Sequence, residues 1–344
     1  MVRDAVPTPI PGPLPDVPDF DPGPLLRQPD VQTIATALRP APAVGPPRRV
    51  LEVPVEDEKA VRVLVNEPAG TPPRGTVLLV HGLAGAADSS YMCWTAVEAL
   101  ARGWTVARMV LRGCDGTIAL SRSLHNAAQS DDVERVLEAL RGTGLPGPFA
   151  AIGFSLGASL VLRATALAGE AAASDIAVGV NPPVDLALCA EALERPRNLH
   201  YRVYFMRRLC RMLEESRRTI EVPGPPARLW RVRSIRQFDD LYTAPMAGFR
   251  DALDYYRRAS VGPVLDRIRR PALVLCSRDD PLIPERSFDG IPRRRGSVLC
   301  RLVRHGGHVG YRQRGPRRFW AAGTVLDWIE AVSGRVDQGG RRSR

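Results

Sequence analysis

Residues 149–164 read "FAAIGFSLGASLVLRA" and join a short apolar run to an apolar helical pattern across a serine. Gly153, Ser155 and Gly157 match the pattern G-x-S-x-G, and Ser155 stands where a predicted strand ends and a predicted helix begins. A turn this sharp holds a serine hydroxyl out at the end of a sheet, and the positive end of the following helix points at it. The segment therefore predicts a nucleophilic serine. The alternative interpretation is a small buried residue at the start of a helix.

Similar apolar runs recur on both sides of this segment and alternate with helical patterns. Runs of this kind, rich in apolar residues throughout, are typical of strands buried on both faces of a parallel sheet. An earlier pair of runs around the acidic turn "EDEK" predicts an antiparallel hairpin that leads into the sheet. The chain is therefore predicted to be an α/β protein with a mostly parallel sheet flanked by helices. The predicted strands are 75–80, 104–110, 148–154, 175–180 and 271–276, with helices at 130–140 and 156–167.

Residues 182–262 interrupt this alternation because no strand separates their helical patterns. Within them, apolar side chains share one helical face opposite a row of arginines: Met206, Leu209, Cys210 and Leu213 against Arg207, Arg208 and Arg211. We interpret the interval as a helical insertion, either a lid that shapes a substrate cavity and touches lipid or an amphipathic packing element. Residues 1–24 carry eight prolines and are expected to be extended. Residues 25–334 then form the main domain, and residues 335–344 a polar tail.

Composition excludes several other classes of protein. The chain has 344 residues, of which 44% are hydrophobic and 25% charged, as in globular proteins. No apolar stretch is long enough for a membrane span and no signal peptide is recognised, so we expect a cytoplasmic protein with at most peripheral membrane contact. The six cysteines are scattered, which predicts neither a metal site nor disulfides, and no cofactor is expected. The net charge is +11, but the arginines are spread along the chain, so no specific nucleic-acid binding is expected. The oligomeric state is left open.

A serine hydroxyl needs a histidine base and an orienting acid to act as a nucleophile. Of the five histidines, only His305 and His308 follow a late strand, and the glycines before His308 favour it as the base. The acid is expected just past the strand 271–276. Asp280 is favoured there, and Asp279 remains the alternative.

An acyl-transfer site also needs backbone donors for the negatively charged oxygen of its intermediate. The strand 75–80 runs directly into the loop "HGLAG" at 81–85, whose glycines permit a tight turn beside the serine. The expected donors of this oxyanion hole are the N–H groups of Leu83 and Leu156. His81 is expected to hydrogen-bond within the loop rather than take part in the chemistry.

Taken together and in order, these segments resemble the YheT-like α/β-hydrolases, which include embryogenesis-associated-type proteins of plants and lipid-acting relatives in animals. The resemblance extends from about residue 20 to 329. It implies an α/β-hydrolase fold with a helical lid, hydrolysis of carboxylic esters, often of acyl lipids, and a triad at Ser155, Asp280 and His308. The segments that carry it are "LLRQPDVQTI", "HGLAGAADSSYM", "LRGCDG", "GFSLGAS", "NPPVDL", "FDDLYTAPMAGFRDALDYYRRAS", "DDPLIP" and "HGGHVGY".

Three departures from the family pattern leave the substrate open. Gly157, Ala158 and Ser159 stand where the family usually has Gly-Gly-Asn, and residues 124–127 replace its Tyr-His-Ser-Gly. A Gly-His pair of the leader is replaced near residues 29–30. The sequence thus predicts a serine esterase for a small-molecule or lipid-like ester with a short to medium acyl chain. The alternatives are an acyltransferase or thioesterase with the same triad, or a non-catalytic binding protein of the same fold.

Overall fold

The structure, a computed structural model, describes residues 13–342 except 39, 71, 230, 316 and 317. Half of the segment 1–24 predicted to be extended, residues 1–12, therefore lies outside the described residues. Residues 13–23 contain no helix or strand. At the other end, the last helix extends to Arg342 and so includes most of the predicted polar tail.

A nine-stranded sheet forms the centre of the molecule, with the order β1-β2-β4-β3-β5-β6-β7-β9-β8. The strands from β4 to β9 run parallel, whereas β1, β2 and the short β8 are antiparallel to their neighbours. The predicted α/β fold, the hairpin and the five predicted strands are confirmed. The bounds are β1 (Arg49–Glu56), β2 (Lys59–Asn66), β3 (Thr76–Val80), β4 (Thr105–Val110), β5 (Phe149–Phe154), β6 (Ile176–Val180), β7 (Ala272–Ser277), β8 (Arg294–Arg295) and β9 (Val298–Val303).

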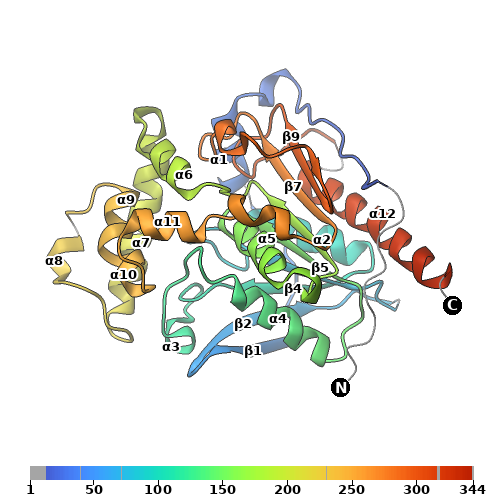
Figure 1. Cartoon of the computed structure of the whole chain (residues 1–344), viewed down its shortest axis with the longest axis horizontal. Coiled ribbons are helices and arrows are strands. Elements are labelled where there is room, and N and C mark those ends of the chain that lie inside the picture. Colours follow the sequence, from blue (N-terminus) through green and yellow to red (C-terminus); the bar gives the residue numbers. More distant parts are fainter. Residues whose placement is uncertain (1–12, 39, 71, 230, 316–317, 343–344) are drawn as a thin grey trace.

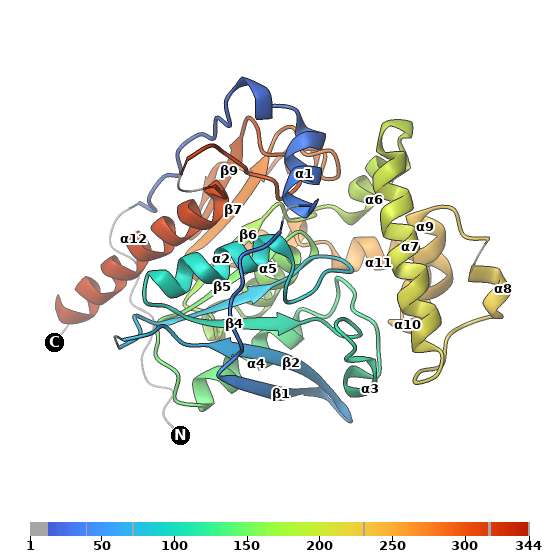
Figure 2. The ribbon, with the colours of Figure 1, turned by 180° about the vertical axis from the view of Figure 1, so that it is seen from behind.

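Helices cover both faces of the sheet (Figure 1, Figure 2), and every residue of the central strands β3, β5, β6 and β7 is therefore buried. On strand β3, Val77 and Leu79 belong to the apolar core under α2 and α12, while Leu78 and Val80 belong to the core under α4 and α5. The bounds of the covering helices are α1 (Pro29–Leu38), α2 (Ser90–Ala101), α4 (Asp131–Gly142), α5 (Leu156–Ala168) and α12 (Trp320–Arg342). Short helical turns are η1 (Pro24–Leu26), α3 (Ile118–Ser121), η2 (Gly169–Ala171), η5 (Gly262–Arg267) and η6 (Glu285–Phe288).

Between β6 and β7 the chain forms a separate group of helices, seen at the left of Figure 1. Its longest member, α7, buries the predicted apolar face, including Leu209 and Leu213, and exposes Arg207, Arg208 and Arg211. The members are α6 (Leu186–Glu194), η3 (Pro196–Asn198), α7 (Leu199–Ser216), α8 (Pro226–Leu229), α9 (Ile235–Phe238), η4 (Asp239–Thr243), α10 (Ala244–Met246) and α11 (Ala252–Ala259). Below, this group is called the helical wall. No helix in the described part of the chain has the length and apolar character needed to cross a bilayer.

Candidate active site

Ser155 lies on a strained turn between β5 and α5, with φ 52° and ψ −122°. Two positions before it and two positions after it, only glycine fits. A Cβ on Gly153 would lie 2.1 Å from the carbonyl oxygen of Gly157, and a Cβ on Gly157 would lie 2.3 Å from that of Val80. The G-x-S-x-G pattern is therefore a packing requirement of this turn, and strain of this kind is concentrated at functional sites.

The structure brings the predicted serine, histidine and aspartate together at the ends of three strands. His308 Nε2 lies 2.8 Å from Ser155 Oγ, and His308 Nδ1 lies 2.9 Å from Asp280 Oδ2. With the Nδ1 proton donated to the carboxylate, Nε2 is free to accept the proton of the serine hydroxyl. This arrangement can activate a serine for attack on a carbonyl carbon.

Asp280 is fixed by four hydrogen bonds. Its side chain is fully buried, and Oδ1 accepts from the N–H groups of Leu282 and Ile283 at 2.8 and 3.0 Å. Besides His308, Oδ2 accepts from Asn181 Nδ2 at 2.6 Å. Asn181 has a left-handed backbone (φ 51°), a conformation that Asn tolerates better than most residues. Sequence reasoning missed this residue, and its only signal was an Asn directly after a strand.

The competing pair, Asp279 and His305, has different partners. Asp279 accepts a hydrogen bond from the N–H of Gly307 at 3.0 Å and pairs with His305 Nδ1 at 3.4 Å. Burial raises the pKa of Asp279. The pair thus braces the loop that carries His308 and has no hydrogen bond to Ser155 or His308 in the described structure.

Helix α1 holds the same loop from the other side. The N–H of His308 donates to Thr33 Oγ1 at 2.8 Å, and the carbonyl of Gly307 accepts from Ser277 Oγ at 2.6 Å. The sequence offered no reason to place residue 33 beside the histidine, so this contact was also missed.

The loop after β3 brings backbone donors to the serine. A Cβ on Gly82 would lie 3.0 Å from Ser155 Cβ, so this loop passes directly over Ser155. The N–H groups of Gly82 and Ala84 donate to the Tyr91 hydroxyl and to His125 Nε2. None of the loop and turn hydrogen bonds of the described residues uses the N–H of Leu83 or Leu156, which leaves both predicted oxyanion donors available.

Two buried histidines shape this loop. His81 donates from Nδ1 to the carbonyl of Gly82 and accepts at Nε2 from the N–H of Leu111. Burial lowers the pKa of both His81 and His125 to about 4, so both rings are neutral at pH 7. The predicted internal hydrogen bond of His81 is present, and neither ring bonds to Ser155.

A cavity of about 540 Å³ opens in front of Ser155 between the sheet and the helical wall. Leu83, Leu156, Ser155 and His308 line it at the sheet, and apolar side chains line most of the rest: Leu186, Leu193, Phe205, Leu209, Met212, Leu213, Ile235, Phe238, Tyr242, Met246, Phe249, Tyr255, Leu282 and Ile283. A cavity of this size and character fits a small organic ligand.

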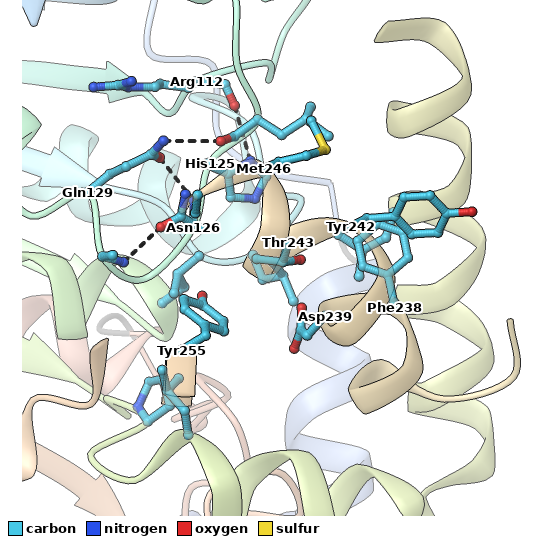
Figure 3. A pocket seen from close by; sticks show the side chains of 18 of the residues that line it. Arg112, His125, Asn126, Gln129, Phe238, Asp239, Tyr242, Thr243, Met246 and Tyr255 are labelled. Carbon is cyan, nitrogen blue, oxygen red and sulfur yellow. Dashed lines mark hydrogen bonds between the residues drawn. The ribbon is translucent and has the colours of Figure 1, made fainter. Parts of the chain in front are cut away.

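Polar side chains line another part of the cavity. Arg112 bonds both oxygens of Asp132. Gln129 Oε1 accepts from the N–H of Asn126 at 3.0 Å (Figure 3). No group of three or more His, Cys, Asp or Glu side chains that could hold a metal ion exists among the described residues.

The departures from the family pattern take different places around the cavity. Ala158 and Ser159 are fully buried and do not line it; Ser159 Oγ instead donates to the carbonyl of Pro183. Leu124 and Asn126, by contrast, do line it. The replaced segment 124–127 is therefore the departure that shapes the pocket.

Comparison with known proteins agrees with this fold. Residues 75–313 match the family model for the alpha/beta hydrolase fold. The chain is 31% identical to "Putative esterase YheT" of Escherichia coli, over 77% of this chain and 79% of that protein. It is 29% identical to human "Phospholipase ABHD3" (69% and 59%) and 28% identical to "Monoacylglycerol lipase" of Saccharomyces cerevisiae (71% and 57%).

Solved structures share the fold at low sequence identity. Est1E from Butyrivibrio proteoclasticus has a TM-score of 0.54 at 12% identity, covering 83% of this chain and 99% of its own. The Pyrococcus furiosus esterase Pf2001 has a TM-score of 0.52 at 14% identity, covering 84% and 92%.

Proposed function

We infer the function from one premise: the chain belongs to the α/β-hydrolase family, where it is a YheT-like enzyme that hydrolyses esters. We propose that Ser155 is its nucleophile, His308 its general base and acid, and Asp280 the carboxylate that orients the imidazole. The hydrogen-bonded series from Ser155 Oγ through His308 to Asp280, at 2.8 and 2.9 Å, is the observation that carries this proposal.

The proposed reaction has two halves. His308 Nε2 takes the hydroxyl proton as Ser155 Oγ attacks the ester carbonyl, and the resulting oxyanion is bound by the N–H groups of Leu83 and Leu156. Collapse of this intermediate transfers the proton from His308 to the departing alkoxide, so the alcohol leaves and an acyl-enzyme remains. Water then attacks with the same proton transfers and releases the acid. Asp280, held by Asn181 and two backbone donors, orients and stabilises the imidazolium.

The proposed substrate is an ester of a short- to medium-chain or lipid-like acid. The mostly apolar cavity of about 540 Å³ supports this class, because its walls replace water around an alkyl chain. The names of relatives that act on phospholipids and monoacylglycerols support the same class.

Active-site labelling tests the proposal. A fluorophosphonate, which phosphonylates activated serines, is expected to modify Ser155, and peptide mapping identifies the modified residue. Ser155→Ala is expected to lower kcat/KM for p-nitrophenyl octanoate by roughly 10⁴ to 10⁶, the scale seen when a triad serine is removed.

Ser159→Ala is the matched control. Ser159 lies one turn along the same helix but outside the cavity, so its removal should leave labelling intact and activity within about tenfold. Labelling of the Ser155→Ala protein at the wild-type rate, or normal ester hydrolysis by it, would show that another residue is the nucleophile.

A further inference from the structure

The helical wall places one carboxylate in the otherwise mostly apolar cavity. Asp239, the first residue of η4, is 8% exposed and lines the cavity together with Ser155 and His308. Tyr256 donates its hydroxyl to Asp239 Oδ2 at 2.6 Å, and the hydroxyl of Thr243 lies near this carboxyl. Figure 3 shows Asp239 and Thr243 on the same side of the helical turn. This turn is a π-helix, a form found frequently at functional sites.

The carboxylate of Asp239 has no counter-charge among the residues that the structure describes. No arginine or lysine pairs with it in the described part of the chain, and the nearby charge of Asp240 has the same sign. Burial raises the pKa of Asp239 to about 6, so the group is mostly ionised at neutral pH despite the cost of desolvation.

The packing of the wall does not require this charge. A neutral oxygen would serve equally well as acceptor for Tyr256. Asp240, the adjacent residue, already ties the turn to α11 by accepting from the N–H of Ala252 at 2.7 Å, and it lies outside the cavity lining. Asp239 is thus a costly acceptor that faces the space where substrate binds.

We propose that Asp239, Thr243 and Tyr256 form a polar subsite for a free hydroxyl group on the alcohol part of the ester, so that partial esters of polyols are preferred substrates. An ionised carboxylate can only accept, so a substrate hydroxyl can donate its proton to Asp239. Aromatic side chains around the subsite, Phe238, Tyr242 and Tyr255, exclude water and strengthen the bond. This inference rests on the proposed function, because the subsite shares its cavity with Ser155.

Two esters of the same acid separate this subsite from the rest of the cavity. We compare kcat/KM for 1-monooctanoylglycerol and for propyl octanoate, which lacks the hydroxyls. Asp239→Asn is expected to lower the value for the glycerol ester by roughly 10 to 100-fold, as for loss of a hydrogen bond to a charged group, and that for the propyl ester by less than about threefold. Asp240→Asn is the matched control and should change neither by more than about threefold.

The other results overturn the inference in distinguishable ways. If Asp239→Asn lowered kcat/KM equally for both esters and also lowered the melting temperature strongly, Asp239 would only stabilise the helical wall. If kcat/KM stayed unchanged for both esters, Asp239 would bind no part of the substrate. A loss confined to octanoylcholine would assign the subsite to a cation instead. If the unmodified enzyme hydrolysed none of these esters and reacted with no fluorophosphonate, the proposed function itself would fail.

Discussion

The two walls of the cavity are built in opposite ways. At the sheet, backbone atoms approach so closely that Gly153 and Gly157 tolerate no side chain, and the carboxylate of Asp280 is bonded to three backbone or side-chain donors besides the imidazole hydrogen bond. The helical wall consists mainly of aliphatic and aromatic side chains with space between them. The difference indicates that the two walls have different functions. We propose that backbone geometry at the sheet fixes the chemistry and that side chains of the helical wall select the substrate.

The largest effect on kcat/KM is expected from two adjacent aspartates at the sheet end of the cavity, which we call the sheet wall. Asp280→Asn keeps the shape of the side chain but removes the charge that orients His308, so kcat/KM is expected to fall by roughly 10³ to 10⁴. Asp279→Asn alters only the ion pair with His305 and should lower kcat/KM by less than about tenfold. Steady-state kinetics on p-nitrophenyl octanoate measure both.

An unchanged melting temperature shows that each variant is folded. If Asp279→Asn caused the larger loss, the acid would be assigned to the wrong member of the pair and the sheet wall would be less rigid than its hydrogen bonds indicate.

Stability should separate the walls next. In Gly157→Ala the new methyl group would lie 2.3 and 2.5 Å from the carbonyl oxygens of Val80 and His81, which are backbone atoms of the sheet end. We expect a loss of at least about 3 kcal/mol in the free energy of unfolding, measured with urea. Met212, in the helical wall, is half-buried and its side chain faces the open cavity. Met212→Ala should therefore lower the free energy of unfolding by only about 1 kcal/mol. Equal losses would mean that the two walls are equally packed.

The same contrast explains how much the sequence predicted. Strands, the helical insertion and the positions of Ser155, His308 and Asp280 follow from patterns that short-range physics requires: apolar runs, a G-x-S-x-G turn and polar residues after strands. Parallel strands end at a common edge, so residues that follow them can be expected to meet there.

Contacts between distant segments could not be predicted in this way. Thr33 supports the backbone of His308 from 275 residues away, and Asn181 bonds Asp280 from 99 away. Each depends on a loop conformation that no local pattern specifies. Nor could the sequence show which departure from the family pattern shapes the pocket, since only the packed structure shows that Ala158 and Ser159 are buried behind the cavity and that Leu124 lines it.

Acid should act on the two walls with opposite sign, and this is the smallest effect expected. At the sheet wall, burial lowers the pKa of His125 from 6.5 to about 4. The unfolded chain therefore takes up this proton first, and stability is lost as the pH falls from 6.5 towards 4. Between pH 7.5 and pH 5 this histidine should lower the free energy of unfolding by about 2 kcal/mol. His125→Gln keeps an acceptor for the N–H of Ala84, and the stability that this variant loses between the two pH values should be smaller by that amount.

In the helical wall the pKa of Asp239 is raised from 3.8 to about 6, so the stability it contributes is present at low pH and lost as the pH rises through 6. Acidification to pH 5 should raise the contribution of Asp239 to the free energy of unfolding by about 1 kcal/mol. In Asp239→Asn this gain is absent, so the total loss of stability between pH 7.5 and pH 5 should be larger by that amount. Urea unfolding of the two variants at both pH values measures the opposing changes, with His200→Gln, at a half-exposed histidine, as the control. Changes of the same sign would show that the charge of Asp239 is compensated in the folded protein, because only an uncompensated buried carboxylate gains stability from its proton.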